Sequence, residues 1–212
     1  MKLQAALDYF TLDQALKLME EIHQYVDIAE IGSPQMFADG FRSIAEVKKK
    51  YPEVLVLADM KVVDGGYDIA SEAYKAGADI ATTIGLTTDD TLLGVVKAAR
   101  VHNKYCMADT IGIKNLGENV KKLDEMGFDY ILLHTAHDAI GNTAEAASQI
   151  DKIQEMKKLV KHAKIGISGG ITLSIIDRVC AADPDWVVIG GGLTSVKNPA
   201  ETAKALRRYI ID

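Results

Sequence analysis

The chain has 212 residues, of which 48% are apolar and 25% charged, as in globular rather than disordered, fibrous or membrane proteins. Its 24 Lys and Arg against 30 Asp and Glu give a net charge of −6, and no stretch concentrates basic residues, so nucleic acid is not expected as a partner. No apolar window reaches the roughly 18 residues of a membrane span, no signal-peptide core is evident, and two cysteines fit reduced thiols, so we expect a cytoplasmic protein without membrane contact.

Eight short apolar runs recur along the chain. Between them lie segments with the apolar spacing of helices, such as the one that holds Leu12, Ala15, Leu16 and Met19. The runs are residues 3–7, 26–31, 54–58, 78–84, 105–108, 130–133, 165–167 and 186–189. The sequence therefore predicts a repeating unit of strand, loop, helix and loop.

Glycine marks two points at which a predicted helix ends and a strand begins. Gly77 stands in the run AGAD (76–79) and Gly127 in the run MGFD (126–129), and AADPD (181–185) repeats the pattern in altered form. Glycine after a helix end accepts a left-handed backbone at little cost. These junctions favour a regular alternation of strands and helices.

Eight such units predict a closed (β/α)8 barrel, a TIM barrel, formed by one compact domain over residues 1–212. The alternative is a doubly wound open sheet. No GxGxxG motif follows the first run, where LDYF (7–10) stands instead, and eight is the number of strands that closes the barrel. The longest connection, residues 135–147, is expected to be a functional loop.

Polar residues follow most of the predicted strands, at the end where the loops of such a barrel converge and where its chemistry is found. Any one carboxylate there could be a solvated loop residue or a helix cap, but the set together predicts an active site. The set is Asp8, Glu30, Asp59, Lys61, Asp64, Asp109, His134, Ser168, Gly169, Gly170, Gly190, Gly191 and Gly192.

Three of these residues suggest metal and proton chemistry. Asp59 and Lys61 lie two apart, so a strand places them on one face, either for catalysis or as a structural ion pair. Glu30 lies in an otherwise apolar run, where an unpaired carboxylate is costly to bury. With Asp59 it could supply two oxygen ligands to Mg²⁺. A salt bridge from Glu30 to Lys61 is the alternative.

The two glycine clusters suggest a phosphate site. The loops after the seventh and eighth strands of TIM barrels commonly bind phosphate, and glycine leaves their backbone N–H groups accessible. Glycine pairs are common in turns, so the prediction rests on both clusters together. Ser168, which precedes the first cluster, is included in the predicted substrate site.

Two histidines complete the candidate site. His134 ends an apolar strand and would point into the barrel mouth, where an imidazole can transfer a proton. A structural core histidine is the alternative. His137 lies on the long connection and could contact the substrate.

The stretch LADMKVVD (57–64) resembles the Asp-x-Lys-x-x-Asp motif of the orotidine 5′-monophosphate decarboxylase suprafamily. The stretches DIAEIG (27–32) and ISGGI (167–171) are similar to its sugar-phosphate branch, and the resemblance covers nearly the full chain. It implies Mg²⁺ bound by Glu30 and Asp59, an enediolate intermediate, and a homodimer with active sites at the subunit interface. The position of Asp64 reaches the neighbouring subunit's site in that family.

The resemblance also implies roles for individual residues. His134 would be the acid/base group, with Lys61 and Asp64 as further candidates for proton transfer. Asp8 and Asp109 would hold substrate hydroxyls.

Two activities are implied by different members of that branch. One is an aldehyde-lyase that condenses D-ribulose 5-phosphate with formaldehyde, and the other decarboxylates 3-keto-L-gulonate 6-phosphate. The decarboxylases carry Arg where this chain has His137 and Gly192, and Glu where it has Asp109, whereas HTAHD (134–138) and VIGGGLT (188–194) are similar to the aldehyde-lyases. We therefore expect the aldehyde-lyase. A barrel that binds a sugar phosphate without turnover is an alternative of another class.

Overall fold

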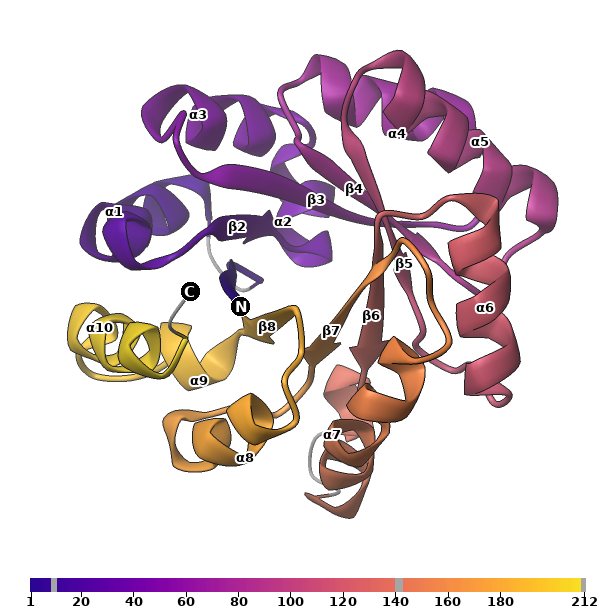
Figure 1. Ribbon diagram of the computed structural model, residues 1–212. Helices are drawn as coiled ribbons and strands as arrows, with labels where there is room; N and C mark the ends of the chain where they lie inside the picture. Colours follow the sequence, from indigo (N-terminus) through magenta and orange to yellow (C-terminus); the bar gives the residue numbers. More distant parts are fainter. Residues whose placement is uncertain (9–10, 140–142, 211–212) are drawn as a thin grey trace.

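In the computed structural model, which describes residues 1–8, 11–139 and 143–210, eight parallel strands close into a barrel in chain order (Figure 1). The first strand pairs with both the second and the eighth, which closes the ring. The strands are β1 (Lys2–Ala6), β2 (Ile28–Ile31), β3 (Leu55–Val62), β4 (Ile80–Ile84), β5 (Tyr105–Asp109), β6 (Tyr130–His134), β7 (Lys164–Ser168) and β8 (Trp186–Ile189). The predicted (β/α)8 barrel is confirmed.

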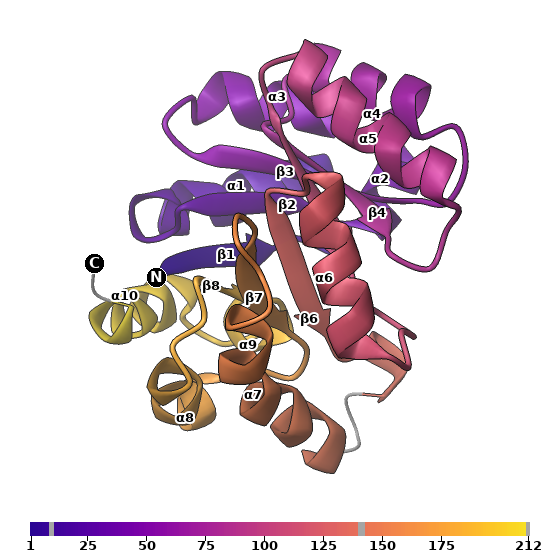
Figure 2. The same ribbon diagram turned by 45° about the vertical axis from the view of Figure 1, so that its right-hand side comes forward.

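Helices surround the barrel, as Figures 1 and 2 show from two directions. They are α1 (Leu12–Ile22), α2 (Ser33–Asp39), α3 (Arg42–Lys50), α4 (Gly66–Lys75), α5 (Asp89–Val101), α6 (Leu116–Met126), α7 (Thr143–Lys157), α8 (Ile176–Ala181), α9 (Gly191–Thr194) and α10 (Pro199–Tyr209), with short 3₁₀ turns η1 (His23–Tyr25), η2 (His137–Ala139) and η3 (Leu173–Ile175). Within the described ranges, none of the helices is both long and apolar enough to cross a membrane.

Strand alternation divides the apolar residues between two layers. One set faces inward and fills the barrel, while the other packs against the helices. The inward set is Ala6, Ile28, Leu57, Ile80, Met107, Leu132, Trp186 and Val188. Two residues beyond Ile28 comes Glu30, and two beyond Leu57 comes Asp59, so both carboxylates continue the inward face of their strands. The barrel core is therefore the floor of the site.

Strand β3 continues to Val62, beyond the predicted run of residues 54–58. Its pairing with β4 shifts register between Ala58 and Val62, and Lys61 adopts a left-handed backbone with a φ of 42°. The Lys61 N–H donates to the side-chain Oγ1 of Thr82, at 3.0 Å, rather than to a strand carbonyl. Such a bulge re-aims a side chain next to a site.

The connection after β6 is shorter than predicted. Residues 135–147 were expected to form a loop, but α7 begins at Thr143, so the loop prediction is wrong for residues 143–147. The stretch TAEAAS (143–148) is rich in alanine, the strongest helix former. Residues 140–142 of the predicted loop lie outside the described residues.

Candidate active site

A cavity of about 670 Å³ opens at the carboxyl ends of the strands. Most of the residues predicted from the sequence line it, namely Asp8, Glu30, Asp59, Lys61, His134, His137, Ser168, Gly169, Gly170, Gly190, Gly191 and Gly192. Asp64 and Asp109 are not among its lining residues. A smaller cavity of about 430 Å³ lies at the opposite end, beside Lys2 and His23, away from this constellation.

Three carboxylates form an acidic cluster in this cavity. Oxygen atoms of Asp8, Glu30 and Asp59 all lie within 4.8 Å of one another. Burial, with the nearby charges of Asp59 and Asp8, raises the pKa of Glu30 well above its usual value, and burial followed by the charge of Asp59 raises the pKa of Asp8. Ionising all three is therefore costly without a cation. Hard carboxylate oxygens at this spacing suit a divalent ion such as Mg²⁺.

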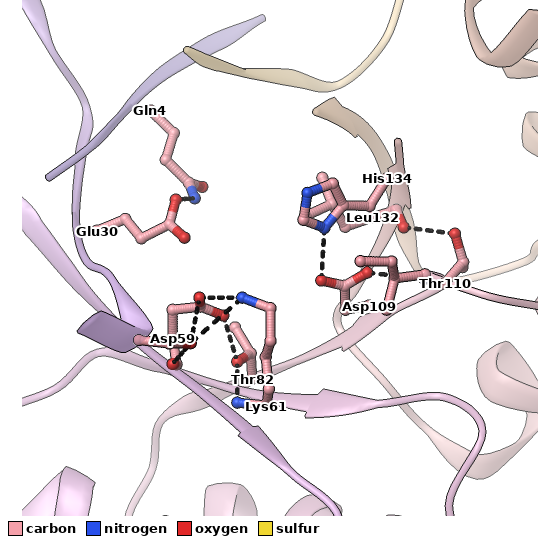
Figure 3. Close-up of polar contacts among 11 residues, drawn as sticks. Gln4, Glu30, Asp59, Lys61, Thr82, Asp109, Thr110, Leu132 and His134 are labelled. Carbon is pink, nitrogen blue, oxygen red and sulfur yellow. Dashed lines mark hydrogen bonds and ion pairs between the residues drawn. The ribbon is translucent and has the colours of Figure 1, made fainter. Parts of the chain in front are cut away.

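Each buried carboxylate has its own supporting contact (Figure 3). Gln4 in β1 donates from Nε2 to Glu30 Oε2 at 2.7 Å. Lys61 Nζ pairs with Asp59 Oδ2, and Ser33 Oγ donates at 2.9 Å to the same oxygen. The ion pair found within the described residues is thus that of Lys61 with Asp59, and not the alternative with Glu30.

The charge of Lys61 is maintained by its acidic surroundings. Burial alone lowers the pKa of Lys61, but the Asp59 charge and hydrogen bond raise it, and the net pKa lies above the usual value. The ammonium group therefore stays protonated at neutral pH. It offsets part of the negative charge of the cluster.

His134 and Asp109 form the second polar pair at the barrel mouth. His134 Nδ1 lies 2.7 Å from Asp109 Oδ2, while Asp109 Oδ1 accepts the Ile111 N–H at 2.9 Å. Asp109 is only 2% exposed. Its Oδ2 contacts the imidazole of His134, and the contact of Asp109 with a substrate hydroxyl stays a prediction.

At two positions of the glycine clusters there is no room for a side chain. Gly169 has a left-handed φ of 107°, and a Cβ there would lie 2.6 Å from the carbonyl oxygen of Thr135. At Gly192 a Cβ would lie 2.3 Å from the carbonyl oxygen of Ile171. Side chains are excluded at both points, so the backbone itself borders the cavity. This arrangement suits an anionic group such as a phosphate.

Asp64 lies apart from the other predicted residues. It is exposed, and its Oδ1 accepts the N–H of Gly65 at 2.8 Å, just beyond the end of β3. Asp64 therefore does not line the cavity of the subunit that carries it.

Three supporting residues were not predicted from the sequence. They are Gln4, Ser33 and Thr82. For Gln4 a signal exists, because it is a polar residue at an inward-facing strand position two before Ala6. Ser33 and Thr82 have no comparable signal, since serine and threonine are common in loops and strands.

Comparison with known proteins places the chain among sugar-phosphate enzymes. A model of the family described as "Orotidine 5'-phosphate decarboxylase / HUMPS family" matches residues 1–206. A 3-hexulose-6-phosphate synthase of Bacillus subtilis is 40% identical over 212 residues, which cover 100% of this chain and 99% of that protein.

Solved structures agree with this comparison. The crystal structure of 3-hexulose-6-phosphate synthase from Salmonella typhimurium superposes with a TM-score of 0.91 at 33% identity, covering 99% of this chain and 98% of that one. A 3-keto-L-gulonate-6-phosphate decarboxylase from Vibrio cholerae superposes with a TM-score of 0.86 at 25% identity, covering 99% and 96% of the two chains.

Proposed function

Because the chain belongs to the orotidine 5′-phosphate decarboxylase / HUMPS family, we propose that it is an aldehyde-lyase acting on a sugar phosphate. The proposed reaction condenses D-ribulose 5-phosphate with formaldehyde to D-arabino-3-hexulose 6-phosphate, and it is reversible. The observation that carries this proposal is one cavity that holds an acidic cluster, the ammonium of Lys61 and the paired imidazole of His134. The relatives named as synthases support the choice.

Mg²⁺ is proposed as the cofactor, held by Glu30 and Asp59. The raised pKa of the buried Glu30 carboxyl supports this, because a bound cation would stabilise the charged carboxylate that burial and the charge of Asp59 disfavour. When bound, such an ion supplies positive charge that stabilises the oxygen atoms of an enediolate. Asp8 lies within the same cluster and is proposed to hold a substrate hydroxyl.

His134 is the proposed acid/base group. Its Nδ1 faces Asp109, and Nε2 is then the ring nitrogen that can exchange a proton with C1 of ribulose 5-phosphate. Lys61 stays charged beside Asp59, which suits stabilisation of developing negative charge. Once the C1 proton is removed, C1 would attack the formaldehyde carbon. The carbonyl π bond breaks as the C–C bond forms, and the resulting alkoxide would take up the proton held by His134.

The phosphate of the substrate is proposed to bind between the two glycine clusters. Gly169 and Gly192 border the cavity with backbone rather than side chains. Ser168 lies at the end of β7 in the same lining. This end of the cavity would fix the sugar, with C1 directed toward the acidic cluster.

A homodimer is the proposed assembly, with Asp64 acting in the partner's site. Exposed apolar side chains lie beside Asp64 in the sequence and on the loop after β4, since Val63 is 63% exposed and Leu86 is 58% exposed. The hydrogen bond from Thr87 Oγ1 to the Val63 carbonyl holds the two loops together. Exposed apolar residues beside a polar group that does not reach its own site favour a shared interface.

The compartment proposed is the cytoplasm. Both cysteines, Cys106 and Cys180, are free, and this fits a reducing environment.

One set of assays tests the proposed function. Purified protein is given ribulose 5-phosphate with formaldehyde, and separately 3-keto-L-gulonate 6-phosphate, with Mg²⁺ or with excess chelator. We expect Mg²⁺-dependent condensation and Mg²⁺-dependent exchange of the C1 proton. Faster decarboxylation would favour the decarboxylase, and sugar-phosphate binding without exchange would favour a barrel that only binds. Full activity in chelator would exclude the metal.

A further inference from the structure

One threonine connects the two residues of the Asp59 and Lys61 ion pair. Thr82 in β4 donates from Oγ1 to Asp59 Oδ1 at 3.0 Å, and the same hydroxyl oxygen accepts the Lys61 N–H at 3.0 Å. The side chain is buried, with 3% of the residue exposed. Figure 3 shows Thr82 between the two residues.

The hydrogen bond to Lys61 stabilises an unusual backbone. Lys61 has a φ of 42°, in a region that residues with a side chain seldom occupy unless their surroundings hold them there. The register shift between β3 and β4 removes the regular strand pairing at this point. The hydroxyl of Thr82 takes the place of the missing strand acceptor for the Lys61 N–H.

The hydrogen bond to Asp59 fixes the orientation of its carboxylate. Asp59 Oδ1 accepts from Thr82, while Oδ2 contacts Ser33 and Lys61. A hydroxyl has one hydrogen to donate, so the Thr82 hydroxyl is committed to Asp59. Its lone pairs are then free to accept from the Lys61 N–H, and one side chain sets both groups.

We propose that Thr82 is a positioning residue for the reaction, acting through Asp59 and Lys61. This inference rests on the proposed function. Thr82 is absent from the cavity lining, so its loss should leave substrate binding nearly unchanged. It should instead misplace the carboxylate and the ammonium, which lowers kcat and weakens the binding of a divalent ion.

The neighbouring Thr83 provides a matched control. It is also fully buried in β4, and its Oγ1 donates to the Val62 carbonyl at 2.7 Å. Its hydroxyl thus donates to strand β3, as that of Thr82 does, but to the Val62 carbonyl and not to the Asp59 carboxylate. A Thr83→Val variant therefore loses a buried strand-to-strand hydrogen bond without losing a contact to the site.

The test compares Thr82→Val, Thr82→Ser and Thr83→Val. For Thr82→Val we expect kcat for condensation to fall by about 10–100-fold, while KM for ribulose 5-phosphate changes by less than about twofold. The affinity of the metal-free protein for Mn²⁺ should weaken by about tenfold, as measured by electron paramagnetic resonance. Thr82→Ser keeps the hydroxyl and should recover most of the parent kcat and most of the parent Mn²⁺ affinity. Thr83→Val should lower the melting temperature to a similar extent while keeping kcat and Mn²⁺ affinity near the parent values.

Parent-like kcat and Mn²⁺ affinity in Thr82→Val would overturn the inference. So would losses of kcat and Mn²⁺ affinity in Thr83→Val that equal those in Thr82→Val. If Thr82→Val does not fold, Thr82→Cys, a weak donor of similar size, is measured on the same scale. If the parent protein binds Mn²⁺ but does not condense the substrates, the proposed function fails, while the Mn²⁺ affinities of the variants still decide the role of Thr82.

Discussion

The imidazole of His134 and the buried carboxylate of Asp109 form a hydrogen-bonded pair, with Nδ1 2.7 Å from Oδ2. The second oxygen of Asp109 accepts the Ile111 N–H at 2.9 Å, which fixes the plane of the carboxylate. An ionised carboxylate only accepts hydrogen bonds, so the proton of a neutral His134 ring is assigned to Nδ1. Nε2 is then the nitrogen with a lone pair available for proton transfer.

Replacing Asp109 with asparagine should change which ring nitrogen of His134 carries the proton. The carbonyl oxygen of the new side chain can keep the contact to Ile111 while its amide nitrogen faces His134 and donates to Nδ1, which moves the ring proton to Nε2. We expect Asp109→Asn to lower the rate of C1 proton exchange by about 10²-fold or more, with little change in KM. Exchange into D₂O, followed by NMR, measures this. Asp177→Asn, at an exposed position on α8, is the control, and parent-like exchange in Asp109→Asn would contradict the assigned tautomer.

The acidic cluster should make the metal-free protein less stable at neutral pH than a variant without Glu30. Burial and the neighbouring carboxylates raise the pKa of Glu30 well above its usual 4.5. A group whose folded pKa is raised gives its full stability below its unfolded pKa and loses it as the pH rises through the folded value. The metal-free Glu30→Gln variant should therefore melt a few degrees above the parent at pH 8, since about 1 kcal/mol corresponds to roughly 2–4 °C at this size.

This difference should close at about pH 3, well below the usual Glu pKa of 4.5, because Glu30 is then protonated in both the folded and the unfolded chain. Adding Mg²⁺ should raise the melting temperature of the parent and leave that of Glu30→Gln nearly unchanged. Calorimetry across pH, with and without Mg²⁺, checks both effects. Glu30→Gln and Asp59→Asn should each also abolish Mg²⁺-dependent turnover, and a parent-like rate in either would remove the metal assignment.

The alternation of apolar runs and helix-end glycines was enough to predict the barrel. Gly77 and Gly127 are left-handed as expected, with φ of 110° and 94°, and in the altered third junction Asp183 takes that conformation with a φ of 53°. These signals are local, because a helix end and a strand period are set by residues close in sequence. The order of strands then follows from short right-handed connections.

Contacts between neighbouring strands could not be predicted in the same way. The aspartates that follow the junction glycines each accept the backbone N–H of the preceding strand, as Asp79 does from Val56 at 2.9 Å and Asp129 from Cys106 at 2.9 Å. The bulge at Lys61 and its contact with Thr82 likewise depend on the register of two strands. Such contacts join residues more than 20 positions apart, and no spacing along one strand encodes them.

Subunit mixing tests the shared site. Asp64→Ala and Glu30→Gln should each be inactive alone, but in a hybrid dimer one site combines an intact Glu30 with an intact Asp64 from the other subunit. An equal mixture that exchanges fully should recover about a quarter of the parent activity, because about half of the dimers are hybrids and each has one complete site. Native mass spectrometry would confirm that hybrids form. No recovery with hybrids present would show that each subunit uses its own Asp64, and a monomer in solution would exclude the shared site.

The choice between formaldehyde condensation and decarboxylation should depend on His137. The decarboxylases are expected to carry arginine where this chain has His137 and Gly192, and both residues line the cavity. A Cβ at Gly192 would come within 2.3 Å of the Ile171 carbonyl oxygen, so a side chain there requires the backbone to move. His137 is therefore the position at which a guanidinium can be introduced.

A guanidinium presents a fixed fork of five N–H donors to a carboxylate or phosphate, whereas an imidazole has only two ring nitrogens and no such fork. We expect kcat/KM for condensation to exceed that for decarboxylation of 3-keto-L-gulonate 6-phosphate by at least about tenfold, or roughly 1.4 kcal/mol of differential transition-state binding. His137→Arg should narrow this ratio by improving decarboxylation, while His162→Arg, at an exposed position before β7, should leave it unchanged. If the parent decarboxylates faster than it condenses, the aldehyde-lyase proposal fails. If His137→Arg leaves the ratio unchanged, substrate choice must be set by other residues of the cavity.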